Sequence, residues 1–322
     1  MKDIVDKNTK FRPVDMWAKI PMGVSFAGDA TSVAVDSKDN VYVFNRGNHP
    51  IAIFDKNGNF LRGLGHGDFI RPHGIEIDAD DNLYLVDDDG HFVQKRNNDG
   101  EILFTIGEKG KPCEWQSGGM FNRPTDIAID PLTRDLFVSD GYGNSRIHKF
   151  DSDGKHIISW GEPGTEPGQF SLPHNITMVG KDKVAVCDRE NFRIQFFSTK
   201  GEFVNEIHIH HPMSITEGKN GDDKIYVGEM LPPPVQQGVP NLGAKVSILD
   251  SDGNIIKQIG DSLPGEGLDQ FTSPHGISTD SNGSIYVAEV AWTAYFSKPE
   301  NSGLEILPLG EVVSLRKWIK VN

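Results

Sequence analysis

The chain has 322 residues, of which 37% are hydrophobic, 35 are glycine and 19 are proline, a composition that favours many short strands over long helices. The formal net charge of −14 argues against nucleic acid or an anionic membrane as the main partner, although a few local arginines can still hold a small anion. Two cysteines exclude a disulfide scaffold, and no apolar run is long enough to cross a bilayer. We therefore expect a cytoplasmic protein, and we further expect it to be a monomer.

One unit recurs six times along the chain. It has an apolar run, an Asp- or Asn-rich turn, a second run that ends in Asp, Asn or Glu, and further strands, which an Asp-Gly or Asn-Gly turn joins in several copies. No such unit could bury its faces alone, and four-stranded units repeated around an axis form a β-propeller. We predict an all-β, six-bladed propeller in a single domain, residues 1–322, with blades at about 31–65, 73–107, 125–161, 174–207, 213–260 and 275–318.

The sixth unit ends one strand short. Near the N-terminus, Met16–Ile20 resembles fourth strands such as Ile158–Gly161. Pairing of an N-terminal strand with the last unit would close the ring and remove two exposed sheet edges. We therefore predict that residues 16–21 complete the sixth blade.

The two ends of the predicted ring differ. Tight turns lie at one end, whereas long irregular connections lie at the other end, where the first strands begin and which we call the mouth. These connections span residues 108–123, 162–173, 230–244, 261–274 and 290–311. Loops of this length are usually binding loops, lids or disordered segments. Met230–Pro234 and the aromatic residues of the last connection, Trp292, Tyr295 and Phe296, could wall a pocket or only cover the ring.

Three first strands begin with Pro-His, at His73, His174 and His275, and the other three begin with Thr31, Thr125 and Met213. The histidines thus belong to alternate blades and should converge on the axis at the mouth. Three imidazoles are the ligand set of an open zinc site, and other divalent transition metals also bind imidazole. A single histidine here would more often be a structural turn residue. All three, however, stand at the same position (the same phase) of their repeat units, which favours a metal.

The residues that follow the second strands should lie beside these histidines. Arg46 and Arg189 occupy this position in the first and fourth units, and Tyr142 lies in the matching loop of the third. Arginine can bind a carboxylate through two parallel hydrogen bonds, and a phenol held near cations can act as a general base. We predict catalytic roles for all three, with surface salt bridges as the alternative for the arginines.

Two other polar runs are expected to be solvated. Asp87–Asp89 resembles an exposed turn, with a calcium or supporting role as a weaker alternative. His208–His211 follows a fourth strand, so we expect it at the solvated outer edge of the ring.

Three segments add a family resemblance: Phe121–Ala128, Val138–Ile147 and Asp188–Asn191. Together with the Pro-His sites they resemble the peptidyl-α-hydroxyglycine α-amidating lyase family, and the likeness spans all six repeats. The resemblance implies a six-bladed propeller that cleaves a carbinolamide C–N bond to release an amide and glyoxylate. It also implies a zinc held by three histidines, a catalytic tyrosine and two active-site arginines, which fall on His73, His174, His275, Tyr142, Arg46 and Arg189.

The resemblance further implies a structural calcium bound by the backbone carbonyls of Val33 and Ile75 and by an aspartate directly after the third histidine. Gly276 stands at that aspartate position, which puts the calcium in doubt. Ser273 stands where the family has a methionine, so the substrate pocket should differ.

These residues lead us to expect a zinc-dependent lyase that cleaves the C–N bond of a small α-hydroxy-amide or carbinolamide, carrying a carboxylate, to a carbonyl product. A zinc-dependent hydrolase or hydratase could use the same site. A non-catalytic NHL-repeat scaffold that binds a protein is the third possibility.

Overall fold

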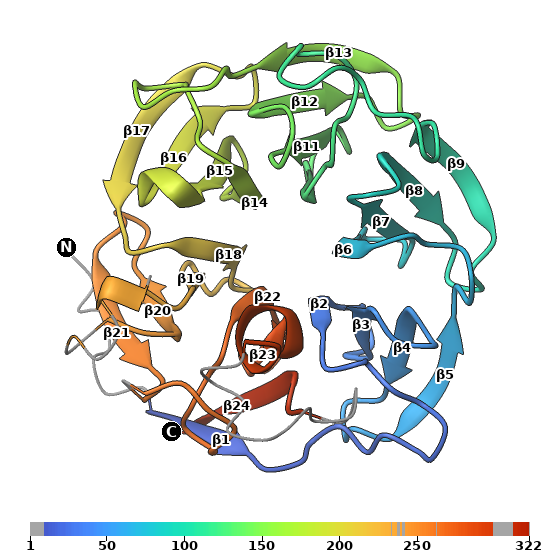
Figure 1. Ribbon diagram of the computed structural model, residues 1–322, viewed down its shortest axis with the longest axis vertical. Helices are drawn as coiled ribbons and strands as arrows, with labels where there is room; N and C mark the ends of the chain where they lie inside the picture. Colours follow the sequence, from blue (N-terminus) through green and yellow to red (C-terminus); the bar gives the residue numbers. More distant parts are fainter. Residues whose placement is uncertain are drawn as a thin grey trace.

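Six antiparallel sheets of four strands each stand around a common axis in the computed structural model (Figure 1). The structure describes residues 10–232, 234–236, 239, 242–261, 263–298 and 312–321. Each sheet is one blade, and its first strand lies nearest the axis. The predicted six-bladed, all-β propeller is confirmed.

The strand bounds follow the predicted repeats closely. The first two blades contain β2 (Ala30–Val35), β3 (Val41–Asn45), β4 (Ile51–Phe54), β5 (Phe60–Leu64), β6 (Pro72–Ile77), β7 (Leu83–Asp87), β8 (Phe92–Arg96) and β9 (Ile102–Gly107). The next two contain β10 (Asp126–Ile129), β11 (Leu136–Asp140), β12 (Arg146–Phe150), β13 (His156–Trp160), β14 (Pro173–Val179), β15 (Lys183–Asp188), β16 (Arg193–Ser198) and β17 (Phe203–His208). The last two contain β18 (Pro212–Glu217), β19 (Ile225–Glu229), β20 (Lys245–Leu249), β21 (Ile255–Ile259), β22 (Pro274–Thr279), β23 (Ile285–Glu289), β24 (Leu315–Val321) and β1 (Lys10–Val14).

Three short helical turns interrupt the connections at the mouth. They are the 3₁₀ helices η1 (Arg189–Asn191) and η2 (Pro234–Gln236) and the π-helix η3 (Trp292–Phe296). Parts of the predicted loops 230–244 and 290–311 lie outside the described residues. No helix in the described ranges is long and apolar enough to span a membrane.

Aspartates at the ends of first strands explain the tight turns at the end opposite the mouth. Oδ1 of Asp36 accepts hydrogen bonds from the backbone N–H groups of Lys38 and Asn40, both at 2.8 Å. Asp78 holds its own turn in the same way. These Asx-type contacts reach only two and four residues ahead, so each repeat carries its own turn chemistry.

The ring closes through the N-terminus, but through a different segment from the predicted one. Strand β1 pairs antiparallel with β24, with Lys10 opposite Val321 and Val14 opposite Lys317. Residues 16–21 form no part of this sheet. Trp17 resembled a fourth-strand tryptophan, but its ring packs into the core 5.0 Å from the ring of Tyr286, between the first and last blades. Closure by an N-terminal strand is thus confirmed, whereas the strand expected at Met16–Ile20 is wrong.

Candidate metal centre

Acidic residues at the ends of second strands hold the chain just before each histidine. The carboxylates of Asp87, Asp188 and Glu289 are fully buried and accept backbone N–H groups from the incoming loops. Their donors are Arg71 N at 2.8 Å, Ser171 N at 2.7 Å and Ser273 N at 3.0 Å, respectively. The acidic residues that end these three second strands therefore set where the three histidines enter the ring.

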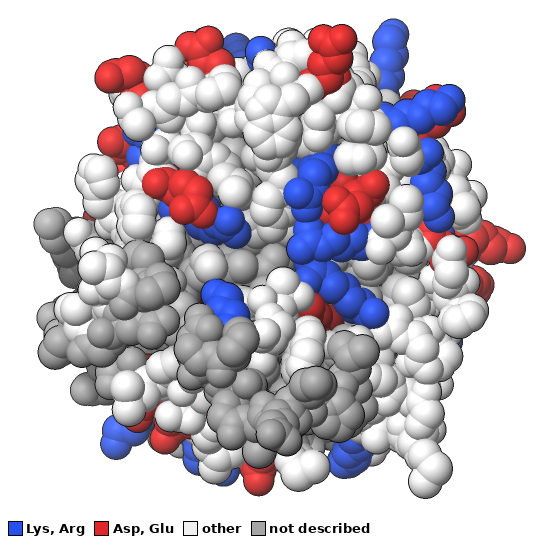
Figure 2. Space-filling view, viewed as in Figure 1, with Lys and Arg blue, Asp and Glu red and all other residues white. Residues whose placement is uncertain are grey.

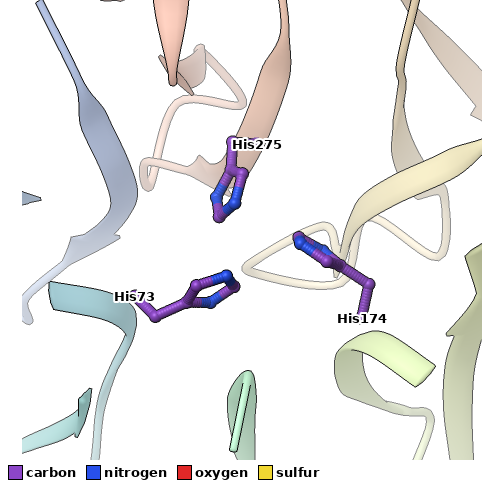
Figure 3. A group of neighbouring side chains, drawn as sticks. All are labelled: His73, His174 and His275. Carbon is purple, nitrogen blue, oxygen red and sulfur yellow. The ribbon is translucent and has the colours of Figure 1, made fainter. Parts of the chain in front are cut away.

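The three predicted histidines meet at the axis (Figure 3). His73, His174 and His275 are buried, and one ring nitrogen of each lies within 4.8 Å of the others. This is the one group of three or more histidine, cysteine or acidic side chains in the described part of the chain that is arranged to hold a metal ion. The phase argument from the sequence therefore placed the three imidazoles correctly.

Backbone carbonyls from the three blades that lack a histidine orient the three imidazole rings. Nδ1 of His73 lies 2.6 Å from the Thr125 carbonyl oxygen, Nδ1 of His174 lies 2.7 Å from that of Met213, and Nδ1 of His275 lies 2.6 Å from that of Thr31. A carbonyl oxygen can only accept, so each Nδ1 must carry the hydrogen. Each Nε2 is then the bare, ligating nitrogen, and the orientation of each ring is held by a carbonyl at the start of the first strand in the next blade, as in many metal sites.

Burial and neighbouring cations keep these imidazoles neutral. Burial lowers the pKa of His73 well below its usual value, with further lowering from His275 and His174. Burial followed by Arg189 does the same for the pKa of His174, and burial followed by Arg46 for that of His275. Neutral imidazole is the form that binds a metal. Three buried, neutral, pre-oriented Nε2 atoms fit a zinc ion or another imidazole-binding divalent metal.

Tyr142 lies against this cluster. Its hydroxyl oxygen is 3.1 Å from Nε2 of His73 and 3.2 Å from Nε2 of His174. The guanidinium of Arg189 lies 6.0 Å from the centre of the phenol ring. The loop after β11 thus brings a phenol hydroxyl within hydrogen-bond distance of two of the three ligand nitrogens.

Arg46 reaches the mouth from the end of β3 and is held from two sides. Its Nη1 lies 2.9 Å from Oδ2 of Asp29 and donates to Oγ1 of Thr293 at 3.1 Å. Thr293 belongs to η3, and its hydroxyl and backbone N–H both bind Asp29. The aromatic loop that was expected either to wall a pocket or to cover the ring is therefore tied directly to this arginine.

Arg189 is held by an acid that a histidine also contacts. Nε of Arg189 lies 2.8 Å from Oε1 of Glu190, and Oε2 of Glu190 lies 3.2 Å from Nε2 of His211. His211 is buried and stacks on Phe192 with ring centres 4.4 Å apart. The expectation of a solvated histidine run is wrong for His211, because the chain turns inward before β18 and places it at the mouth.

The acidic run Asp87–Asp89 is also not the solvated turn that was expected. Asp87 and Asp88 are fully buried, and Asp88 makes ion pairs with Arg71 at 2.6 Å and with Arg123 at 3.4 Å. Sequence reasoning missed both arginines. Each stands one residue before the proline that leads into a first strand, so the two share a position in the repeat, but that position alone does not show that they meet at a buried acid.

The residues do not fit the calcium that the resemblance implies. Val33 and Ile75 lie on inner strands as expected, but Gly276 has no carboxylate. A Cβ atom there would lie 2.5 Å from Cα of Ser32, so the backbone excludes any side chain without a shift. The ammonium of Lys219 donates to the Val35 carbonyl at 2.5 Å and brings a protein cation to the same inner strand.

Known proteins are similar to this chain over most of its length, although no family model matches it. It is 31% identical over 336 residues to a peptidyl-glycine alpha-amidating monooxygenase B of Xenopus laevis, covering 88% of this chain and 36% of that protein. It is 30% identical over 314 residues to peptidyl-alpha-hydroxyglycine alpha-amidating lyase 1 of Drosophila melanogaster, covering 82% and 55%. The chain thus spans between about a third and just over half of these relatives.

Solved structures match the fold. A catalytically inactive virginiamycin B lyase from Staphylococcus aureus, solved with quinupristin, has a TM-score of 0.59 at 16% identity and covers 97% of this chain and all of that one. A streptogramin B lyase has a TM-score of 0.54 at 18% identity, covering 90% and 78%. At these identities the likeness concerns the fold alone. From the curated relatives and the repeats, the chain is a six-bladed propeller homologous to the peptidyl-α-hydroxyglycine α-amidating lyases.

Proposed function

We propose that the protein is a metal-dependent lyase that cleaves the C–N bond of a small α-hydroxy-amide. The observation that carries the proposal is the contact of Tyr142 with His73 and His174, because it joins a proton acceptor to three convergent imidazole nitrogens. The homology to amidating lyases supports the same reaction class.

His73, His174 and His275 would hold the metal, with zinc the first choice. When bound, a zinc ion at this position would act as a Lewis acid toward the substrate hydroxyl. The histidines cannot themselves serve as bases while their Nε2 atoms are ligands. Proton transfer is therefore assigned to Tyr142, whose hydroxyl oxygen lies within hydrogen-bond distance of the Nε2 atoms of His73 and His174.

The proposed reaction needs only a proton shuttle and charge stabilisation. Tyr142, acting as its phenolate, would take the hydroxyl proton of the substrate, the carbon–oxygen bond would become a carbonyl, and the C–N bond would break. The proton then returns to the leaving nitrogen, so that the products are an amide and an aldehyde and no water is consumed. Arg46 and Arg189 would each bind a carboxylate of the substrate or stabilise the developing negative charge.

The test is turnover by the Tyr142→Phe variant with α-hydroxyglycine amides as substrates. We expect kcat to fall at least a hundredfold, because one positioned acid–base group contributes about that much or more. Metal content measured by elemental analysis should stay unchanged. Full activity in this variant would overturn the role of Tyr142.

Hydrolysis or hydration at the same site is the second candidate, since a metal held by three histidines can also activate water. Incorporation of ¹⁸O from labelled water into the product during the bond-breaking step would favour it. An amide product free of solvent oxygen would favour elimination, because only the aldehyde oxygen exchanges with water by reversible hydration.

A further inference from the structure

Two arginines outside the predicted catalytic set converge on one buried acid at the mouth. Arg71 and Arg123 occupy the same position in consecutive repeats, one residue before the proline that leads into a first strand. Nη1 of Arg71 lies 2.6 Å from Oδ2 of Asp88, and Nη2 of Arg123 lies 3.4 Å from Oδ1. Asp88 has no exposed surface. A single buried carboxyl group therefore holds two guanidinium groups side by side.

The acids around this pair do not neutralise Arg71 fully. Asp88 is shared by both arginines, and its burial raises its pKa to about 7 although Arg71 and Arg123 lower it. Arg123 has a second partner, Asp89, at 2.9 Å, whereas only Nη1 of the Arg71 side chain has a hydrogen-bond or ion-pair partner in the described ranges. The remaining nitrogens of Arg71 are available to a ligand.

Arg71 lies two residues before His73 in the chain. Its charge is one of the causes that lower the pKa values of His73, His174 and His275, so it acts on all three imidazoles. The guanidinium of Arg123 lies 4.6 Å from the ring centre of Tyr142. Figure 2 shows Lys and Arg side chains gathered around the centre of the visible face, on a protein whose net charge is −14.

A cavity of about 260 Å³ separates Arg71 from Arg46. Asn48, His66 and Phe69 also line it. The Nε atom of Arg46 is buried and has no hydrogen-bond partner in the part of the chain that the structure describes. Two guanidinium groups thus line one small cavity, which is also lined by Pro72, the residue directly before His73. Paired guanidinium groups are a suitable arrangement for an anion.

We propose that this cavity is a second anion-binding subsite and that the substrate is a small dicarboxylate. One carboxylate, next to the reacting carbon, would bind Arg189, and the other would bind between Arg46 and Arg71. The position of the reacting carbon rests on the proposed function. The cavity is below the range of about 300–1,000 Å³ that drug-sized ligands occupy, so the second carboxylate is carried by a short arm.

The experiment compares the binding of succinate and butyrate, which have four carbons each and differ by one charged group, to the purified protein by isothermal titration calorimetry. We expect the wild type to bind succinate at least about tenfold more tightly, and Arg71→Gln to abolish that preference. Arg62→Gln is the matched control, because Arg62 lies on the outer strand β5 with its side chain 41% exposed. Equal affinities in the wild type, or a preference that survives Arg71→Gln, would overturn the proposal.

A second variant covers the case in which Arg71→Gln fails to fold. Arg71→Lys keeps the charge but loses the guanidinium fork, so we expect the preference for succinate to fall about threefold; an unchanged ratio would contradict the subsite. The readout is binding rather than turnover. A fully active Tyr142→Phe variant would therefore overturn the catalytic role of Tyr142 while leaving the succinate measurement to decide the subsite separately.

Discussion

The two ends of the ring use the same residue types in different ways. At the turn end, Asp36 binds backbone groups two and four residues ahead. At the mouth, Glu289 binds the N–H of Ser273, 16 residues back, and forms an ion pair with Arg316 at 2.6 Å, 27 residues ahead. The turn end therefore contributes local order that each repeat supplies for itself. The mouth depends on long-range contacts, and those contacts position the histidines.

The largest expected effect follows from removing a ligand at the mouth. His174→Ala leaves two imidazoles, and we expect metal affinity to fall at least about a hundredfold, since loss of even a supporting partner typically costs 10–100-fold. Zinc per chain after dialysis, measured by elemental analysis, checks this result. His156→Ala is the control, because His156 lies exposed on the outer strand β13. Stoichiometric metal in His174→Ala would argue against the centre.

Replacing an acidic residue at the mouth should lower the free energy of unfolding far more than replacing one at the turn end. Glu289→Gln leaves the buried Arg316 without its charge partner, and removing one member of such a pair costs about 3–5 kcal/mol. Asp250→Ala removes turn hydrogen bonds to Asp252 and Asn254 and should cost about 1 kcal/mol.

Urea unfolding of both variants beside the wild type measures this difference. Because Glu289 also holds the chain before His275, we expect Glu289→Gln to lose metal affinity as well. Similar unfolding free energies for the two variants would remove the distinction between the two ends of the ring.

The smallest expected effect concerns how the stability contributed by Glu190, which contacts Arg189, depends on pH. The hydrogen bond from His211, and then Arg189, lower the pKa of Glu190 to about 2. A lowered pKa means that Glu190 stabilises the fold above its ordinary value of 4.5, and that this contribution disappears as the pH falls towards 2. The side chain is 39% exposed, so solvent screening limits the effect to roughly 1 kcal/mol or less.

Unfolding midpoints of the wild type and Glu190→Gln at pH 6, 4 and 2.5 check this prediction. The two proteins should differ at pH 6 and converge at pH 2.5. Glu202→Gln, in the turn before β17, serves as the control and should show no such convergence. A constant difference across this range would mean that Glu190 acts through packing rather than charge.

Much of the centre was predictable from the sequence because repeats convert sequence position into spatial position. His73, His174 and His275 share one phase, so their meeting at the axis followed once six blades were counted. Arg71 and Arg123 share a phase as well, but each is an ordinary surface residue until Asp88 is known to be buried between them. Burial depends on how neighbouring blades pack, and no single repeat contains that information.

The sequence by itself determined the number of blades, the strand order within each blade and the alternation of histidines, because hydrophobic period and turn chemistry act within one repeat. Only the tertiary structure decided that Lys10–Val14 closes the ring, because that choice depends on pairing with β24 at the far end of the chain. It also decided that the carbonyls of Thr31, Thr125 and Met213 orient the three imidazoles, since these hydrogen bonds cross from one blade to the next.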